Sequence, residues 1–239
     1  MAQLQDSATY LDKAHIAPEV FQLRPDYRAL LMVATNIPAS PSTAASEAFL
    51  SSAETIAKAT LAQTPLNNIP HVVAWREAYK SFGAKPKKTK SSVEALLSRV
   101  DAGLPRINRL TDIYNAVSTK YQIPLGGEDL DKYVGAPFLV RATGDEKFIN
   151  KSGGEDVVDH PKPGEVVWCD DEGVTCRLWN WRQCSRTALT DLTTSVLFIM
   201  DALEGCGDEK LGEAADELEK ELVKMGGDVE VWRRVLRKE

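Results

Sequence analysis

The sequence predicts one α+β unit, with helical patterns toward both ends of the chain and short strand patterns between them. Helical patterns occur in four segments before residue 120 and again after residue 206. Between 124 and 186 the chain is rich in glycine, turns and β-branched pairs, which is typical of short strands. Because no repeat and no long linker divides the 239 residues, we expect a single domain.

The N-terminal half is predicted to hold one or two strands followed by helices. Residues 15–37 alternate loosely and then become an apolar run, which Pro38 and Pro41 end. A serine pair before Val93 and Glu94 forms a capping-box pattern that opens a helix. The predicted helices cover 42–63, 71–82, 95–100 and 108–119.

The second half is predicted to hold most of the strands and a final helix. The expected strands cover 137–142, 146–150, 165–170, 174–181 and, as a buried strand, 194–203. Residues 206–239 are expected to form a C-terminal amphipathic helix whose apolar stripe docks on the domain. We therefore divide one unit into N-terminal strands and helix (1–69), a core (70–205) and this helix (206–239).

Composition excludes several classes of protein. No apolar run approaches the roughly 20 residues of a membrane span, and the N-terminus lacks the pattern of a secretory signal. Four cysteines without a CxxC pair predict reduced core thiols in a cytoplasmic protein. Three histidines without paired spacing, and no nucleotide-binding or hydrolase motif, predict no metal and no cofactor.

The charge of the chain is unevenly distributed. The net charge is −6, yet residues 84–109 carry seven basic residues against two acidic ones. A polyanion can bind such a segment whatever the overall sign, although a solvated lysine loop is an equal interpretation. The lysines in question are Lys85, Lys87, Lys88 and Lys90.

A family resemblance lies in residues 112–141, DIYNAVSTKYQIPLGGEDLDKYVGAPFLVR. The stretch has, in order, D-x-x-N-x-V, a P-L turn, an aspartate, a D-K pair, a glycine and a V-R strand. It resembles the B3/B4 module of the phenylalanyl-tRNA synthetase β subunit. Segments 75–100, 164–184 and 190–198 extend the likeness to free-standing B3/B4-domain proteins, over roughly residues 70 to 205.

The resemblance implies a mixed sheet around a central cleft with flanking helices. In the synthetase this module hydrolyses tyrosine wrongly attached to the tRNA for phenylalanine. Some free-standing relatives are implicated in editing in trans, with substrates that differ among them and include a non-protein analogue of arginine. The chain departs from the synthetase at two editing positions: Gly126 takes the place of a histidine and Ile199 the place of a glutamate. The cleft therefore uses other groups, or it only binds.

The candidate catalytic residues are Glu128 and Asp129, which follow a double-glycine turn where the backbone can approach a ligand closely. Their carboxylates can orient a water or hold a cationic group; the alternative is a turn with an aspartate cap. Asn115 faces that turn if the arrangement of the family holds, either as a substrate contact or as a buried amide that caps the loop.

The segment CRLWNWRQC (176–184) is the candidate ligand wall. On a strand, Arg177, Trp179 and Trp181 share one side while Leu178, Asn180 and Arg182 share the other. Tryptophan faces can cover a base or an apolar ligand, and arginine can contact phosphate. The alternative is that the tryptophans belong to the core and the arginines pair with carboxylates. The predicted substrate-binding residues are Asn115, Arg177, Asn180, Trp181 and Arg182.

Three functions remain open. The first is a hydrolase that edits mischarged tRNA in trans, with the four lysines on the tRNA backbone. The second is a non-catalytic tRNA-binding or synthetase-associated module, and the third is a small-metabolite hydrolase or binder. The expected partners are aminoacylated tRNA and an aminoacyl-tRNA synthetase; no membrane partner is expected, and a monomer is favoured.

Overall fold

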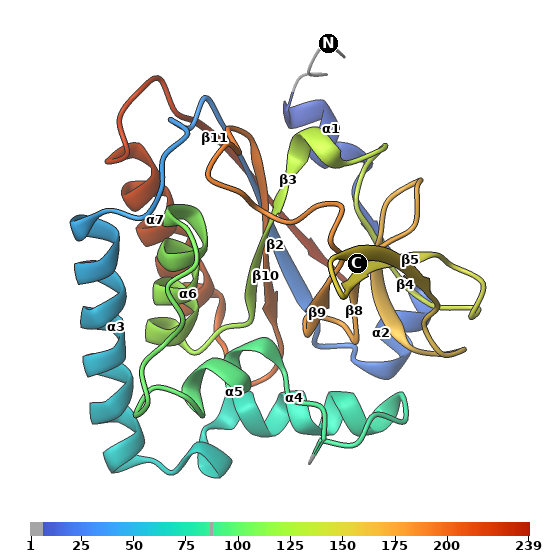
Figure 1. Cartoon of the computed structure of the whole chain (residues 1–239). Helices are drawn as coiled ribbons and strands as arrows, with labels where there is room; N and C mark the ends of the chain where they lie inside the picture. Colours follow the sequence, from blue (N-terminus) through green and yellow to red (C-terminus); the bar gives the residue numbers. More distant parts are fainter. Residues whose placement is uncertain (1–6, 87) are drawn as a thin grey trace.

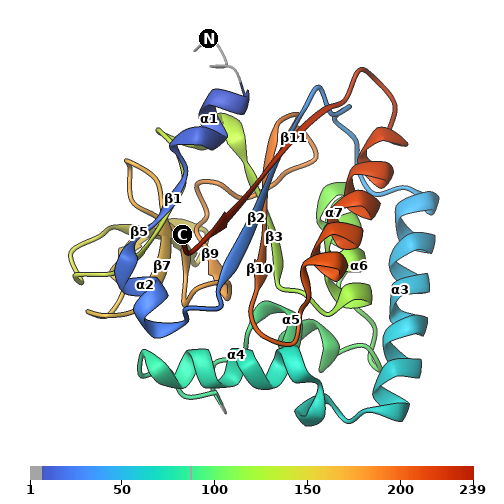
Figure 2. The same ribbon diagram turned by 180° about the vertical axis from the view of Figure 1, so that it is seen from behind.

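Two β-sheets pack on each other in the computed structural model, which describes residues 7–86 and 88–239. Helices cover the other face of the first sheet, and two more helices run beneath both sheets (Figure 1). Figure 2 shows the same layers from behind. The α+β architecture predicted from the sequence is thus confirmed.

The first, central sheet has four strands in the order β11-β2-β10-β3, and every neighbouring pair is antiparallel. Strand β2 from the N-terminal segment lies between β10 and the C-terminal β11, so segments far apart in the sequence are neighbours in this sheet. The strands are β2 (Arg28–Thr35), β3 (Leu125–Asp129), β10 (Val196–Ala202) and β11 (Glu230–Arg237).

The second sheet has the order β1-β4-β7-β8-β9, with β1 parallel to β4 and the other pairs antiparallel. A separate hairpin, β5–β6, extends from it. The strands are β1 (His15–Ile16), β4 (Phe138–Arg141), β5 (Phe148–Ser152), β6 (Glu155–Asp159), β7 (Val166–Cys169), β8 (Val174–Arg177) and β9 (Arg182–Gln183).

The helices follow the apolar periodicity of the sequence. Thr43 caps α3 with a capping box, and Asn108 caps α6 by accepting from the Thr111 N–H. Ser91 caps α5 in the same way by accepting from Glu94 N. The helices are α1 (Ser7–Lys13), α2 (Pro18–Leu23), α3 (Ala44–Gln63), α4 (Pro70–Ser81), α5 (Ser92–Leu97), α6 (Arg109–Tyr121) and α7 (Asp208–Val223), with short 3₁₀ turns η1 (Leu66–Asn68) and η2 (Leu130–Lys132).

Alternate residues of β10 face the two sides of the central sheet. Val196, Phe198 and Met200 pack in the cluster that holds α6 and α7. Leu197 and Ile199 pack in the cluster shared with the second sheet. We call these sides the helix face and the cavity face. The apolar stripe of α7 is buried on the helix face, as the sequence predicted.

Two segments become strands where the sequence predicted a helix and a turn. The C-terminal helix ends at Val223; Gly226 and Gly227 turn the chain with positive φ, and β11 then pairs with β2. The double-glycine segment forms β3, because it pairs with β10 along its whole length. In both cases a strand of the central sheet offers an edge to which the segment pairs by backbone hydrogen bonds. The local periodicity of the sequence does not indicate such long-range pairing.

The expected strand over 174–181 is wrong after Arg177. Leu178 and Trp179 adopt φ of 52° and 66°, and the chain reverses into β9. The turn places Trp179 in the core, fully buried against Tyr27 and Trp75 at ring distances of 5.0 and 5.4 Å. Because two left-handed residues break the two-residue period, the predicted sides of this segment do not exist.

Candidate functional site

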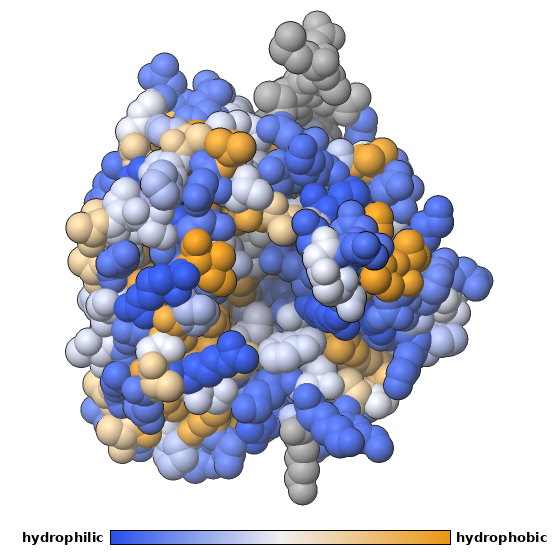
Figure 3. Space-filling model, in the orientation of Figure 1, coloured by the Kyte–Doolittle hydropathy of each residue, from blue (hydrophilic) through white to orange (hydrophobic). Residues whose placement is uncertain are grey.

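A cavity of about 270 Å³ lies where the β3 edge of the central sheet meets the second sheet. Helix α5, helix α6 and the turn between β8 and β9 complete its walls. In the space-filling view the molecule is hollowed near its centre, between the side that carries α3 and α6 and the side that carries the second sheet (Figure 3). Tryptophan rings from β7 and the turn, Trp168, Trp179 and Trp181, supply much of the wall.

Two buried carboxyl groups lie at opposite ends of the cavity wall that the central sheet provides. Glu128 is opposite Leu197 in the strand register, and Asp201 lies four residues further along β10. Four strand residues span about 13 Å. Between them, Gly126 faces Ile199 across the β3–β10 pair, and of these five residues all but Leu197 line the cavity.

Glu128 is held by hydroxyl groups. It is 2% exposed, and its Oε2 accepts hydrogen bonds from Tyr133 Oη at 2.7 Å and Thr187 Oγ1 at 2.9 Å. Burial raises the pKa of Glu128, while the hydroxyl donors act in the opposite direction. A carboxyl with a raised pKa that faces a cavity can accept a proton from a bound water near neutral pH.

Asp201 lies at the other end and is also 2% exposed. Tyr27 Oη donates a hydrogen bond to its Oδ1. Burial raises the pKa of Asp201 to about 7, and the nearby Tyr27, Asn180 and Trp168 side chains oppose that rise. The carboxyl borders the cavity within an aromatic wall. Whether it is ionised therefore depends on what occupies the cavity.

Several polar side chains on the cavity wall have no hydrogen-bond partner among the described residues. Asn115 is 7% exposed and its amide bonds no described residue. Ser92 Oγ, Trp168 Nε1 and Asn180 Nδ2 are buried and likewise unpaired within the described part of the chain. Because buried polar atoms are normally paired, this concentration in one cavity indicates a site for a polar ligand.

Four of the residues predicted from the sequence meet in this cavity: Asn115, Glu128, Asn180 and Trp181. Asn180 is oriented by its Oδ1, which accepts from Tyr79 Oη at 3.2 Å and from the Ser92 N–H at 3.3 Å. Its Nδ2 is then the end of the amide left for the cavity.

Asp129, the second predicted catalytic residue, does not line the cavity. Its Oδ1 accepts from the Asp131 N–H at 3.1 Å, and its Oδ2 accepts from Thr193 Oγ1 at 2.9 Å. Successive strand residues face opposite sides, so Glu128 and Asp129 cannot share a site. The alternative interpretation, an aspartate that caps a turn, describes its environment.

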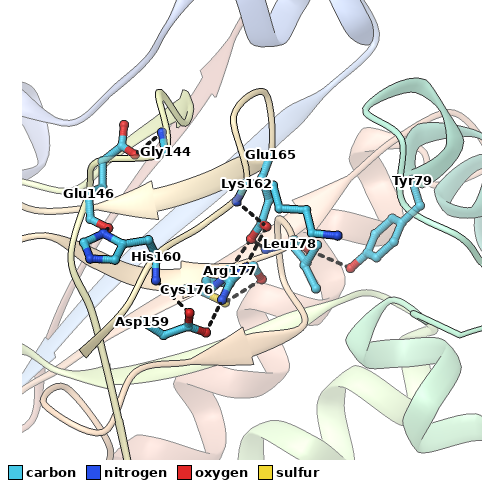
Figure 4. A network of polar contacts seen from close by, with 10 residues as sticks. All are labelled: Tyr79, Gly144, Glu146, Asp159, His160, Lys162, Glu165, Cys176, Arg177 and Leu178. Atoms are coloured by element: carbon cyan, nitrogen blue, oxygen red, sulfur yellow. Dashed lines mark hydrogen bonds and ion pairs between the residues drawn. The ribbon is translucent and has the colours of Figure 1, made fainter. Parts of the chain in front are cut away.

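The two predicted arginines lie outside the cavity as well. The Arg177 guanidinium binds Glu165 at 2.9 Å and Asp159 at 2.7 Å, and joins hairpin β5–β6 to the second sheet (Figure 4). Arg182 is exposed and lies 5.6 Å from the centre of the Phe148 ring. Pairing with carboxylates, the alternative stated for the arginines, applies to Arg177.

The predicted lysines belong to the loop that leads from α4 into α5. Lys85 and Lys88 are exposed, and Lys90 Nζ lies 3.3 Å from Ser98 Oγ. Lys87 lies outside the described residues. Helix α5 forms one wall of the cavity, and the exposed Arg99 in the turn after α5 also lines it, so this basic segment leads to the mouth.

Sequence reasoning missed Asp201, Trp168 and Arg99. The signal for Asp201 was an acidic residue inside an apolar run predicted to be a buried strand, which is a costly place for an unpaired charge. Trp168 and Arg99 carried no comparable signal, because strand and helix positions alone do not show which face meets a cavity.

The described ranges contain no group of three or more His, Cys, Asp or Glu side chains placed to hold a metal ion. Within the same ranges, no helix has the length and apolarity needed to cross a membrane. The four cysteines are buried and free, as the sequence predicted.

Comparison with known proteins bears on the family. The family model described as the B3/4 domain matches residues 74–210, which is more than half of the chain. No curated protein matches. A solved structure, an N-terminal fragment of the phenylalanyl-tRNA synthetase β subunit from Pyrococcus horikoshii, is similar at 12% identity with a TM-score of 0.46. The match covers 91% of this chain and 50% of the synthetase fragment, so this chain spans half the length of that fragment. The match to the family model agrees with the order of motifs in residues 112–141: the chain belongs to the B3/4 domain family.

Proposed function

We propose that this protein is a cytoplasmic editing hydrolase that removes a wrong amino acid from mischarged tRNA in trans. The observation that carries the proposal is the cavity in which the buried Glu128 carboxyl and the unpaired Asn115 amide face the same space. Membership of the B3/4 family supports it, because the module in the synthetase acts on such esters. The basic segment at the mouth supplies a surface for the acceptor end of tRNA.

The reaction is hydrolysis of the ester between the amino acid and the terminal ribose. Glu128 accepts a proton from a bound water as the water oxygen bonds to the ester carbonyl carbon. The Asn115 Nδ2 donates to the carbonyl oxygen as negative charge develops there. The ester C–O bond then breaks, the ribose oxygen takes the proton from Glu128, and the amino acid leaves as a carboxylic acid that ionises by releasing its proton to solvent. An activated ester needs no protein nucleophile.

The second candidate is a non-catalytic module that binds tRNA or associates with a synthetase. One observation favours it: Gly126 and Ile199, which replace the histidine and the glutamate of the synthetase, face each other in the cavity wall. If the two lost groups are indispensable for editing in every member of the family, this cavity binds its ligand without hydrolysing it.

The test is a deacylation assay on a panel of tRNAs charged with non-cognate amino acids. We expect the wild type to clear at least one ester, and Glu128→Gln to lower the rate constant by about 10²-fold or more. Arg182→Ala, outside the cavity, is the matched control and keeps wild-type activity. Binding of charged tRNA that weakens steeply with salt, without hydrolysis, supports the second candidate. Absence of both activity and tRNA binding leaves the small-metabolite function.

A further inference from the structure

We infer that Asp201 selects the amino acid, by accepting a hydrogen bond from a donor group at the far end of a long side chain. The inference rests on the proposed function and names a specificity residue and the class of side chain for the same cavity. It depends on three features of the cavity: the distance between its two carboxyls, the wall between them, and the unpaired groups around Asp201.

The distance between the two carboxyls separates the place where the ester is hydrolysed from the place where the side chain is selected. Glu128 and Asp201 lie on the same face of the β3–β10 pair, four strand residues apart, which corresponds to about 13 Å. An ester carbonyl placed at Glu128 and Asn115 therefore leaves its side chain free to extend toward Asp201. A short side chain leaves that end of the cavity empty, whereas a long one reaches it.

The wall between the two carboxyls leaves a path for such a side chain. Gly126 has no side chain, and the nearest atom to an added Cβ there is Gln183 Nε2 at 3.5 Å. Ile199 opposite offers an apolar surface, and Trp168 and Trp179 line the cavity further on. An aliphatic or aromatic stem fits this stretch because nothing on the sheet wall there needs a hydrogen bond.

The end of the path is polar. Asp201 accepts a hydrogen bond from Tyr27, and Trp168 Nε1 and Asn180 Nδ2 lie beside it, close enough to lower its pKa as donors although neither makes a hydrogen bond of good geometry among the described residues. Of the described residues that line the cavity, Arg99 alone is cationic, and it is an exposed residue in the turn that follows α5. The carboxyl therefore has no counter-charge at its own end of the cavity.

This arrangement discriminates between amino acids because an unsuitable side chain leaves a hydrogen bond of Asp201 unmade. A side chain that ends in a donor replaces the water that Asp201 would otherwise bind. An apolar side chain of equal length removes that water, so the buried carboxyl loses one hydrogen bond and keeps the one from Tyr27; such a loss is a strong form of rejection by a binding site. Hydroxyl, amide and cationic donors share the same hydrogen-bond chemistry at Asp201.

The test uses tRNA esters paired by side-chain length, one ending in a donor and one apolar: glutamine with methionine, and lysine with norleucine. We expect the wild type to favour the donor-ended member of at least one pair by about 10²-fold in kcat/KM. Asp201→Leu should abolish or reverse that ratio. Asp201→Asn keeps an acceptor without charge, so it should retain discrimination for the glutamine pair and lose it for the lysine pair.

The ratio within a pair separates selection from a merely structural role, since a loosened fold lowers both rates together. An unchanged ratio in Asp201→Leu, or no preference in the wild type, overturns the inference. If no ester is hydrolysed, the proposed function fails by itself. The same pairs, linked to tRNA by an amide that resists hydrolysis, then give the answer by equilibrium binding. A donor preference that Asp201→Leu removes upholds the inference, and equal binding overturns it.

Discussion

On the helix face of the central sheet, Val196, Phe198 and Met200 pack against α6 and α7 in an apolar cluster. On the cavity face, the alternate residues Leu197 and Ile199 are followed by Asp201, whose carboxyl is buried beside tryptophan rings. The same strand thus contributes to a core and to a polar cavity. Because a strand alternates its side chains, stability and ligand recognition can be assigned to adjacent residues without competing for the same space.

The largest expected contrast is between Phe198→Ala and Ile199→Ala. Phe198 is fully buried on the helix face, so its truncation should lower the free energy of unfolding by about 3–5 kcal/mol. Ile199 borders space that already exists, and its truncation should cost about 2 kcal/mol, because it opens no new enclosed void. Urea unfolding of both variants measures the difference. Equal losses would show that the cavity face is packed as tightly as the helix face.

The cavity face should also respond to pH through Asp201. The folded-state pKa of about 7 lies above the ordinary value of 3.8, so the folded protein binds the proton more tightly. The stability that this provides is present below pH 3.8 and is lost as pH rises through 7. The Asp201→Asn variant lacks this loss, so its stability relative to wild type should improve from pH 4 to pH 8. Asp145→Asn, at an exposed carboxyl, should show no such trend.

His71, beneath the sheet, should give the opposite trend. Its Nδ1 lies 2.9 Å from Gln122 O, while Nε2 accepts from Trp75 Nε1 at 3.0 Å and from the Leu203 N–H at 3.1 Å. Burial lowers the pKa of His71 from 6.5 to about 4. Its contribution to stability is therefore complete above pH 6.5 and is lost as pH falls through 4.

Unfolding measured between pH 7 and pH 4 tests this trend. His71→Gln should have a shallower loss of stability over that window than the wild type. His160→Gln, which removes an exposed imidazole, should keep the wild-type loss. An identical slope in all three proteins would assign the acid sensitivity to carboxyl groups instead.

Periodicity predicted α3 to α7 and β10 because those elements are amphipathic or wholly apolar, but it did not predict the short helices α1 and α2. It failed at β3 and β11, whose strand structure comes from partners at the sheet edge. It also failed after Arg177, where two non-glycine residues adopt left-handed φ and the chain turns inward around Trp179. Tertiary packing decides these places, and no local pattern reports it.

Residues of the site could be predicted only where a polar side chain differs from its neighbours in the sequence. Glu128 follows two glycines and Asn180 lies between two tryptophans, and both line the cavity. Asp129 and Arg177 are charged residues close to Glu128 and Asn180 in the sequence. Their side chains bind Thr193 and Glu165, however, and do not line the cavity. Asp201 shows the limit most clearly: its identity was visible in the sequence, but its distance from Glu128 depends on the register of β10 against β3.

The smallest expected losses of stability lie within β3, where Gly127→Ala is compared with Gly126→Ala. A Cβ on Gly127 would lie 2.9 Å from Phe198 Cε1 and 3.0 Å from Leu189 Cδ1, so the helix face must shift, at a cost of about 1–3 kcal/mol. A Cβ on Gly126 meets Gln183 Nε2 at 3.5 Å, an ordinary contact, and should leave the free energy of unfolding nearly unchanged. Thermal and urea unfolding of the two variants compare adjacent glycines on opposite faces. Comparable losses at both would mean that the cavity has no room for even a methyl group beside Gly126, and the path toward Asp201 would be closed.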